Sequence, residues 1–531
     1  QHELTNEEYA QANLIPGETE FEQDGRRYRV HSVDLATGQV ELTDLTFAQS
    51  AGFPILRVER IDTIRAYLEH PAPPEPPREP KKSRTAALSN VLYPEQTDRH
   101  DHRITDDALG VGTPSQRYQN NIAAIRLLKQ LESEGRLATP EEQAILSRYV
   151  GWGGLADCFE ETNRNYLELK NLLIPEEYEA ARESTLTAFY TPPVVIRSMY
   201  QALEQMGFET GNVLEPSCGI GNFLGMLPES MSGSKLYGVE LDDLSGRIAR
   251  QLYQRSSIAV QGYEKTAFPD NFFDVAIGNV PFGQFHVPDK RYDRLNFPIH
   301  EYFIAKALDQ VRPGGVIAVV TSSYTMDKRT ASARKYIAQR SELLGAIRLP
   351  NNAFKGSGTK IMTDVIFLQK RDTLRQQDEP WLHLAEDANG ITMNRYFVEH
   401  PEMICGRMEI VSGPYGPTPT CQPIDPDAVD RFGKPLLETQ IDTAMQHLTA
   451  TLTKAEIPMQ EESGEDTKYI DADPFVRNFS YTVKDDKIYY REGAVMRECN
   501  PNAASAERIR ILVELRATAS ALIDVQLQDL S

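Results

Sequence analysis

Paired cysteines, long apolar runs and clustered histidines are all lacking in this chain of 531 residues. The five cysteines are scattered without a CxxC pair, which excludes a dense disulfide framework and predicts free thiols in a reducing cytoplasm. No run approaches the roughly 18 consecutive apolar residues of a membrane span, and polar residues open the sequence, so we expect neither a membrane partner nor a signal peptide. The ten histidines show no metal-ligand spacing, and we predict no metal site.

The net charge of −21 argues by itself against a nucleic-acid partner, but its distribution favours one. Residues 281–370 hold 14 lysines and arginines against 7 aspartates and glutamates, a net of +7 that leaves −28 for the rest of the chain. A charge run is often only a solvated helix face. The functional alternative is a surface that faces phosphates, and we expect it in this basic segment.

The length predicts several domains, and the composition marks their boundaries. Residues 1–70 are expected to form a small α+β accessory domain, because strand-like alternation is followed by a helix pattern at 60–70. The proline-rich stretch 71–84 is expected to be an extended linker. Residues 85–186 are expected to be helical and to pack on the core. One helix opens with Thr139 as cap, Pro140 in the first turn and Glu142 closing a capping box, and Trp152 is expected to be a core residue.

Residues 187–370 change to short apolar runs separated by helical segments. The runs are NVLEP, KLYGVEL, IAVQG, DVAIGN, GGVIAVVTS, LLGAIRLP and DVIFLQK. This alternation predicts an α/β fold with a doubly wound, mainly parallel sheet that binds ligands at the carboxyl ends of its strands. Residues 371–531 are expected to be a mixed extension of hairpins followed by a terminal helix. That helix pattern lacks a capping residue, so we expect the chain to be a piece of a longer protein.

Residues suited to chemistry follow several of these predicted strands. In VLEPSCGIGNFLG, Gly219 and Gly221 permit a sharp turn and a close approach of backbone to ligand, although a dinucleotide site looks similar. Glu240 ends the next strand, where an acid accepts hydrogen bonds from ribose hydroxyls; the alternative is a plain surface acid. The loop GNVPFG then places the amide of Asn279 and an aromatic ring at a strand end. A core does not need that arrangement, whereas a site for a flat ligand does.

The order of these motifs resembles that of the adenine-N6 DNA methyltransferases in which the cofactor motifs precede the catalytic one. AFYTPP is similar to their leading motif, LEPSCGIGNF to their glycine motif, GVELD to their ribose-binding acid, and NVPF to their catalytic Asn-Pro-Pro-Tyr/Phe. RYVGWGGL, NVPFG and RLPNNAFKGSGT further resemble the large methylase–helicase proteins of conjugative and phage-like mobile elements. The resemblance covers residues 85–370. It implies the S-adenosylmethionine-dependent methyltransferase fold and cofactor, double-stranded DNA as partner, and a linked helicase part.

The functional residues of that family carry over to the matching positions. Val280 stands where the family has its first proline, and the acid–aromatic pair before the catalytic strand aligns with Tyr263 and Glu264 in swapped order. The resemblance implies that the cofactor contacts Tyr190, Thr191, Glu215, Gly219, Gly221, Glu240, Leu241 and Glu264. It implies that the target base contacts Asn279, Val280, Pro281 and Phe282.

The chemistry of adenine supports this carry-over. The lone pair of the amino group is delocalised into the ring, and two acceptors, the Asn279 side-chain oxygen and the backbone carbonyl of Val280, are expected to make the nitrogen nucleophilic. Phe282 is expected to stack on the base. A duplex base must first flip out, and cations of the basic segment are expected to hold the backbone meanwhile. The predicted DNA contacts are Lys328, Arg329, Arg334, Lys335 and Phe354, of which Phe354 either walls the base pocket or plugs the core.

Two alternatives stay open at this point. The same kind of loop methylates planar amino groups in RNA or in protein glutamine, so the motif alone does not choose the acceptor. The second alternative is a DNA-binding module of a helicase that keeps the fold without turnover, which Val280 and the swapped acid would fit. Cys218 is not a convincing nucleophile for cytosine methylation, because it lies inside the glycine turn, where a small residue suffices.

Overall fold

A computed structural model describes residues 14–23, 26–34, 39–45, 56–60, 64, 92–105, 110, 112–185, 190–354, 361–413, 416–425, 429–430, 433–448, 452, 469–473 and 475–529. Its contacts divide the chain into two units, Gln1–Arg84 with Gly283–Ile299, and Thr85–Phe282 with His300–Ser531. The five cysteines are buried and unpaired, which confirms the prediction of free thiols. None of the helices in the described ranges combines the length and the apolar character that a membrane crossing requires.

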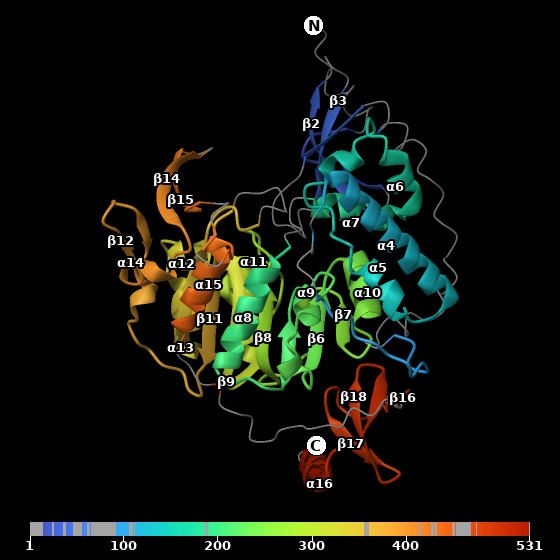
Figure 1. Cartoon of the computed structure of the whole chain (residues 1–531). Helices are drawn as coiled ribbons and strands as arrows, with labels where there is room; N and C mark the ends of the chain where they lie inside the picture. The colour runs from blue at the N-terminus through green and yellow to red at the C-terminus, as the bar shows by residue number, and fades with distance from the viewer. Residues whose placement is uncertain are drawn as a thin grey trace. The chain divides into compact units, whose positions relative to one another are not determined.

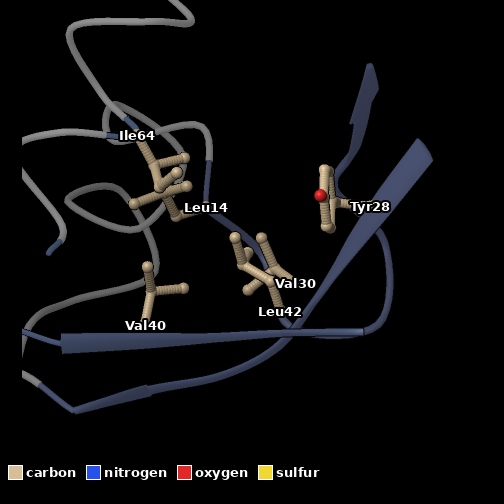
Figure 2. Packing of buried hydrophobic residues seen from close by; sticks show 6 residues of the cluster. All are labelled: Leu14, Tyr28, Val30, Val40, Leu42 and Ile64. Carbon is tan, nitrogen blue, oxygen red and sulfur yellow. The ribbon is translucent and has the colours of Figure 1, made fainter. Parts of the chain in front are cut away.

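The first unit contains a four-stranded antiparallel sheet in the order β1-β2-β3-β4. Its strands are β1 (Glu20–Gln23), β2 (Arg26–Asp34), β3 (Gln39–Asp44) and β4 (Leu56–Arg60). The alternation along β3 turns every second side chain inward, as expected for a strand with one buried face. The predicted helix at 60–70 lies outside the described residues, apart from Arg60 and Ile64, and so does the linker 71–84. Figure 2 shows the small core, which consists of Leu14, Tyr28, Val30, Val40, Leu42 and Ile64.

The helical segment that precedes the central sheet confirms the sequence pattern. Its helices are α4 (Pro114–Glu134), α5 (Pro140–Leu146), α6 (Tyr166–Leu172) and α7 (Pro175–Ser184), with a short 3-10 turn, η2 (Ala156–Phe159). The capping box that opens α5 is present: Glu142 N donates to Thr139 Oγ1 at 3.3 Å, and Thr139 N donates to Glu142 Oε2 at 2.9 Å. Trp152 is buried between the rings of Tyr118 and Phe159, as predicted for a core residue.

A charged network attaches these helices to the domain that follows. Arg247, on α10 (Asp243–Leu252), pairs with Glu132 of α4 at 2.5 Å and with Glu177 of α7 at 2.7 Å. Lys129 also pairs with Glu177, at 2.6 Å. Glu177 is buried, and its bonds to the two cations hold the pKa of its carboxyl below the usual value despite that burial. The helical segment therefore packs on the core, as predicted.

A seven-stranded sheet forms the centre of the second unit, and the seven apolar runs each supply one strand. The strands are β5 (Asn212–Glu215), β6 (Lys235–Glu240), β7 (Ser257–Val260), β8 (Phe273–Asn279), β9 (Val311–Ser322), β10 (Ser341–Leu349) and β11 (Thr363–Lys370). Their order is β10-β11-β9-β8-β5-β6-β7. The pairs among β5 to β9 are parallel, whereas β11 runs antiparallel to both β9 and β10. The predicted doubly wound, mainly parallel sheet is confirmed.

The strand order fixes where a ligand site lies. The chain runs outward from β5 through β6 to β7, and then returns to place β8 on the other side of β5. In open α/β sheets, ligands bind at such a reversal, outside the carboxyl ends of the strands. The helices among these strands are α8 (Pro193–Gln205), α9 (Asn222–Gly225), α10, α11 (Ile299–Gln310), α12 (Tyr324–Asp327) and α13 (Ser332–Arg340) (Figure 1). Short 3-10 turns are η3 (Glu229–Met231), η4 (Tyr263–Lys265) and η5 (Asp293–Leu295).

The extension after β11 has the predicted mixture of hairpins and helices. It contains β12 (Leu384–Glu386), β13 (Thr392–Asn394), α14 (Arg395–Glu399), the hairpin β14 (Arg407–Gly413) and β15 (Gly416–Gln422), and α15 (Leu436–Gln446), with turns η7 (Pro380–Leu382) and η8 (Pro401–Met403). A second sheet follows, with β16 (Tyr469–Asp471), β17 (Tyr481–Lys484), β18 (Lys487–Glu492) and β19 (Val495–Cys499), and α16 (Ala503–Asp529) ends the described chain. Helix α15 packs on α8, where Ser198 Oγ donates to Asp442 at 2.8 Å.

Candidate active site

The glycine turn after β5 takes a backbone course that only glycine follows easily. Gly219 has φ 56° and Gly221 has φ 89°, both in the left-handed region. A Cβ atom on Gly221 would lie 2.3 Å from the Tyr253 ring, so a larger residue would also collide there. Cys218 N donates to Val239 O at 2.9 Å, which holds the turn against β6. Cys218 is buried in this turn, and burial raises the pKa of its thiol, so it is poorly suited to act as a nucleophile.

Glu240, at the end of β6, is bonded to the glycine turn itself. Its Oε2 accepts from Gly219 N at 2.6 Å, and its Oε1 accepts from Asp242 N at 2.7 Å. Burial raises the pKa of this carboxyl from 4.5 to about 7, and the neighbouring charge of Asp242 contributes. A carboxylate offers about four lone-pair sites, so two backbone donors leave room for ribose hydroxyls. Glu240 is thus a fixed acceptor rather than a mobile surface acid.

Glu215 ends β5 beneath the same turn. Its side chain is buried, and Oε2 has no hydrogen-bond partner in the described part of the chain. Burial raises the pKa of this carboxyl well above its usual value. A Cβ on Gly278, the residue before Asn279, would lie 3.2 Å from Glu215 Cγ, so β5 and β8 approach closely here. A buried carboxyl oxygen without a partner suits a ligand that carries positive charge.

Tyr190 and Thr191 come into the site from the segment before α8. Burial raises the pKa of the Tyr190 hydroxyl, and the carboxylates of Asp242 and Glu240 raise it further, so Tyr190 lies within electrostatic reach of both. Thr191 is buried.

Leu241 and Glu264 follow the ends of β6 and β7. Leu241 directly follows Glu240 and is 75% exposed, which is unusual for a leucine beside a core strand. Glu264 lies in η4, and its carboxylate closes over Gly262, where a Cβ would meet Glu264 Oε1 at 2.2 Å. Tyr263 is instead buried and donates to Gln310 at 2.6 Å. The aromatic member of the swapped pair is therefore a core residue, whereas Glu264 is half-buried in the turn after β7.

The loop after β8 is held at its first peptide group, the one that joins Asn279 to Val280. Asn279 pairs with Val320 of β9, and its carbonyl accepts from Ser217 Oγ at 2.7 Å. Val280 N donates to Val320 O at 3.1 Å, and the Val280 side chain is buried. Pro281 and Phe282, the next two residues, are half-buried. The sequence analysis assigned no role to Ser217, although it lies within the glycine motif. Its hydroxyl, directly after Glu-Pro at the end of a strand, was the feature that could have indicated a contact with a neighbouring strand end.

Two of the predicted DNA contacts are buried, and for Phe354 the burial favours the second of its two predicted roles, a core residue. Arg334 is only 1% exposed, and its guanidinium donates to the carbonyls of Leu382 and Thr325 at 3.3 to 3.5 Å. Phe354 is 2% exposed, so its ring packs in the core and does not wall an open pocket. Arg348 of the same basic segment is also buried, paired with Asp364 and Asp327 at 2.9 Å each. The charge count of this segment therefore overstates the charge at its surface.

The other predicted cations are accessible. Arg329 and Lys335 are exposed and line an open groove of about 310 Å³ between α13 and the start of β12, with Arg334 buried among its lining residues. Lys328 is half-buried, and its Nζ lies 3.7 Å from Glu301 Oε1. The groove adjoins α12, which directly follows β9, the strand that pairs with Asn279.

The strand order, the antiparallel β11 and a glycine turn bonded to an acid at the sheet reversal define an S-adenosylmethionine-dependent methyltransferase domain. Residues 174–391 match the family model of the N-6 DNA methylases. Its residues fit the cofactor: Glu240 supplies an acceptor for the ribose, and the unpartnered oxygen of Glu215 suits the positively charged methionine end.

Three known proteins illustrate the similarity. Defense against restriction protein B of Escherichia phage P1 is 29% identical over 281 residues, which are 51% of this chain and 11% of that protein. Type II methyltransferase M.CvrRI of Paramecium bursaria Chlorella virus XZ-6E is 27% identical over 183 residues, 34% of this chain and 47% of that protein. A class I methyltransferase from Listeria monocytogenes, whose structure is solved, is 19% identical with a TM-score of 0.33 over 50% of this chain and 91% of its own. The chain thus spans less than half the length of both curated relatives.

Proposed function

We propose that this chain methylates DNA, with S-adenosylmethionine as methyl donor and the N6 amino group of adenine as acceptor. The single observation that carries the proposal is the hydrogen bond from Ser217 Oγ to the Asn279 carbonyl. It joins the glycine turn of the cofactor site to the loop that matches the catalytic motif, within a domain that matches the N-6 DNA methylase family model. The Type II methyltransferase among the relatives is in keeping with this activity.

The acceptor loop would activate the amino nitrogen by taking hydrogen bonds from its two hydrogens. The side-chain oxygen of Asn279 is one acceptor, and the backbone carbonyl of Val280 is the other. The single peptide group between Asn279 and Val280 is held by Ser217 at its carbonyl and by Val320 at its N–H, which restrains the loop that carries both acceptors before the base arrives. Phe282 stacks on the base, a contact worth about 1–3 kcal/mol in other base–aromatic pairs. No covalent enzyme intermediate is required, and positioning supplies most of the rate.

S-adenosylmethionine supplies an electrophilic methyl group on a sulfonium. Tyr190, Thr191 and Glu215 are proposed to hold its methionine end, while Gly219 and Gly221 let the backbone approach it. Glu240 is proposed to accept from the ribose hydroxyls. Leu241 and Glu264 are proposed to hold the adenine ring, the first by apolar contact and the second as an acceptor for its amino group.

The DNA backbone is proposed to lie on Lys328, Arg329 and Lys335. Lys328 and Arg329 follow α12, and Lys335 lies in the first turn of α13, so all three come soon after β9, the strand that pairs with Asn279. Phosphate contacts of this kind fix the position of a duplex without reading its sequence. Such a grip suits an enzyme that must flip a base out of the stack, at a cost of a few kcal/mol.

We also propose the domain limits of the chain, its origin in a mobile element and its cellular location. We propose an accessory domain over 1–70, a linker over 71–84, a helical segment over 85–186, the catalytic domain over 187–370 and an extension over 371–531. Because the phage P1 relative is far longer than its matched part, we propose that a longer form of this protein carries further parts, among them a helicase. We place it in the cytoplasm of a host that harbours a mobile element.

The test is an acceptor comparison. The chain is incubated with cofactor labelled in its methyl group and with DNA that lacks N6-methyladenine, with RNA, and with protein. Nucleoside analysis should find N6-methyladenine in the DNA sample. Label in RNA or in glutamine would support the alternative acceptors, and cofactor binding without transfer to any sample would support an inactive DNA-binding module.

A further inference from the structure

An exposed tyrosine stands at the carboxyl end of β9. Tyr324 opens α12 and is 57% exposed. It lies four residues beyond Val320, which pairs with Asn279 and accepts the hydrogen bond of Val280 N. The carboxyl ends of parallel strands share one edge of a sheet, so Tyr324 and the acceptor loop leave β9 and β8 at the same edge.

The backbone of α12 is firmly held while the tyrosine ring is left outside. Thr325 and Met326, its neighbours, are buried, and Thr325 Oγ1 lies 2.9 Å from Thr321 Oγ1. Tyr324 N donates to Ser322 Oγ at 3.3 Å, and the Tyr324 carbonyl accepts from Lys328 N at 3.0 Å. The Tyr324 hydroxyl makes no hydrogen bond to any described residue. The fold therefore uses the backbone at this position but not the side chain.

An isolated exposed aromatic is common and needs no explanation. Tyr324 is not isolated, because Lys328, Arg329 and Lys335 follow within the next eleven positions, and the last two line the groove beside α13. Exposed aromatic rings among cations are typical of surfaces that bind nucleic acids, where the rings stack on bases and the cations hold phosphates. In the described part of this unit the other exposed aromatic is Phe475, in the C-terminal extension.

We propose that Tyr324 inserts its ring into the duplex beside the target adenine and fills the space that the flipped base leaves. The proposal rests on the proposed function. A ring that enters the duplex must project from the surface, as Tyr324 does. Side chains that wedge between base steps stabilise unstacked DNA, and Tyr324 would do so while the neighbouring cations hold the backbone.

The test compares Tyr324→Ala with Tyr324→Trp and with Phe475→Ala, a control that removes an exposed ring elsewhere. Methyl transfer is measured on duplex DNA and on the same DNA as single strands. We expect Tyr324→Ala to lose about tenfold or more on the duplex, the scale of one base–aromatic contact, and little on single strands. Tyr324→Trp should retain activity, because any aromatic face can stack. Thermal unfolding and cofactor binding of Tyr324→Ala should match the parent.

A binding measurement keeps the inference separate from catalysis. Fluorescence polarisation compares an intact short duplex with one that carries an abasic site in place of an adenine, which leaves the same space as the flipped base. The parent should bind the abasic duplex more tightly than the intact one, and Tyr324→Ala should lose that preference. The inference would be overturned if Tyr324→Ala lost methyl transfer equally on duplex and on single-stranded DNA. It would also be overturned if Tyr324→Ala still preferred the abasic duplex. If the parent makes no N6-methyladenine, the proposed function fails. The preference for the abasic duplex over the intact one still decides the role of Tyr324.

Discussion

The two halves of the central sheet carry opposite kinds of ionisable side chain at their carboxyl ends. Glu215, Glu240 and Glu264 follow or end β5, β6 and β7, whereas Lys328, Arg329 and Lys335 follow β9 on the other side of β8. The cofactor is cationic at its sulfonium and its ammonium, and DNA is anionic. Under the proposed function, acidic groups would therefore face the cofactor and basic groups the DNA, a partition that the net charge of −21 conceals.

The halves also differ in how rigidly they hold their charges. Glu240 is fixed by two backbone N–H donors, and Glu215 is buried. Arg329 and Lys335 are exposed on a groove. Fixed, partly desolvated carboxylates respond to pH, whereas exposed cations respond to salt. We therefore expect pH to change mainly the binding of the cofactor and salt to change mainly the binding of DNA.

Asn279→Ala should have the largest effect on methyl transfer, because Asn279 ends β8, the strand between the acidic and the basic half of the sheet. Loss of one preorganised hydrogen-bonding group should lower methyl transfer by about 100- to 1000-fold. Cofactor affinity should stay nearly unchanged, since Asn279 belongs to the acceptor loop. Single-turnover transfer and calorimetry measure the two effects, with Asn389→Ala in an exposed turn as control. Full activity of Asn279→Ala, or label on cytosine, would show that the loop is structural.

Glu240 tests the acidic half. Glu240→Ala should weaken cofactor binding by about tenfold or more, the scale of hydrogen bonds to a charged group. In the parent, affinity should fall as the pH falls through 7, because the raised pKa of about 7 means that the carboxylate acceptor is protonated there. The stability of the free protein responds with the opposite sign. Between pH 4.5 and about 7 the folded chain holds this proton and the unfolded chain does not, so protonation stabilises the fold as the pH falls.

The check is calorimetric titration of the cofactor across this pH range. Glu240→Gln should show a flatter pH profile of affinity than the parent, while Glu386→Gln on β12 should leave the profile unchanged. An identical profile for the parent and Glu240→Gln would remove Glu240 from the ribose site.

Arg329→Glu with Lys335→Glu tests the basic half. The double variant should weaken duplex binding and lower the slope of log affinity against log salt by about 2, since each phosphate contact contributes roughly 0.9. Lys484→Glu with Arg508→Glu makes the same charge change in the C-terminal extension and should leave the slope unaltered. Arg334→Met should instead lower the melting temperature and keep the slope, because Arg334 is buried. If the double variant at Arg329 and Lys335 kept the salt dependence of the parent, the DNA surface would lie elsewhere.

Val280→Pro should have the smallest effect of these changes. Proline restores the residue usual in the family but removes the N–H that donates to Val320 O. The free energy of unfolding should fall by about 0.5–1.5 kcal/mol, the typical net value of one hydrogen bond. Urea unfolding measures it, with Val280→Ile as a control that keeps the N–H. Stability equal to the parent would show that the bond to Val320 contributes nothing.

The sequence predicted the elements well and the side-chain directions poorly. Seven apolar runs and the Thr139 capping box are local patterns, so they identified strands and a helix start without tertiary information. The burial of Arg334 depends on Leu382, 48 residues away, whose carbonyl it reaches. No local pattern reveals such a partner. The same holds for Ser217 and Asn279, which meet only because β5 and β8 are neighbours in the sheet.

The bond between Ser217 and Asn279 has a thermodynamic consequence. It makes the cofactor turn and the acceptor loop one cooperative element, so the two substrates are coupled through the protein as well as through direct contact. Coupling free energies are reciprocal. Whatever the bound cofactor adds to the affinity for the flipped base, the flipped base adds equally to the affinity for the cofactor. Under the proposed function, a single 2.7 Å contact would let each substrate strengthen the binding of the other, without a moving lid.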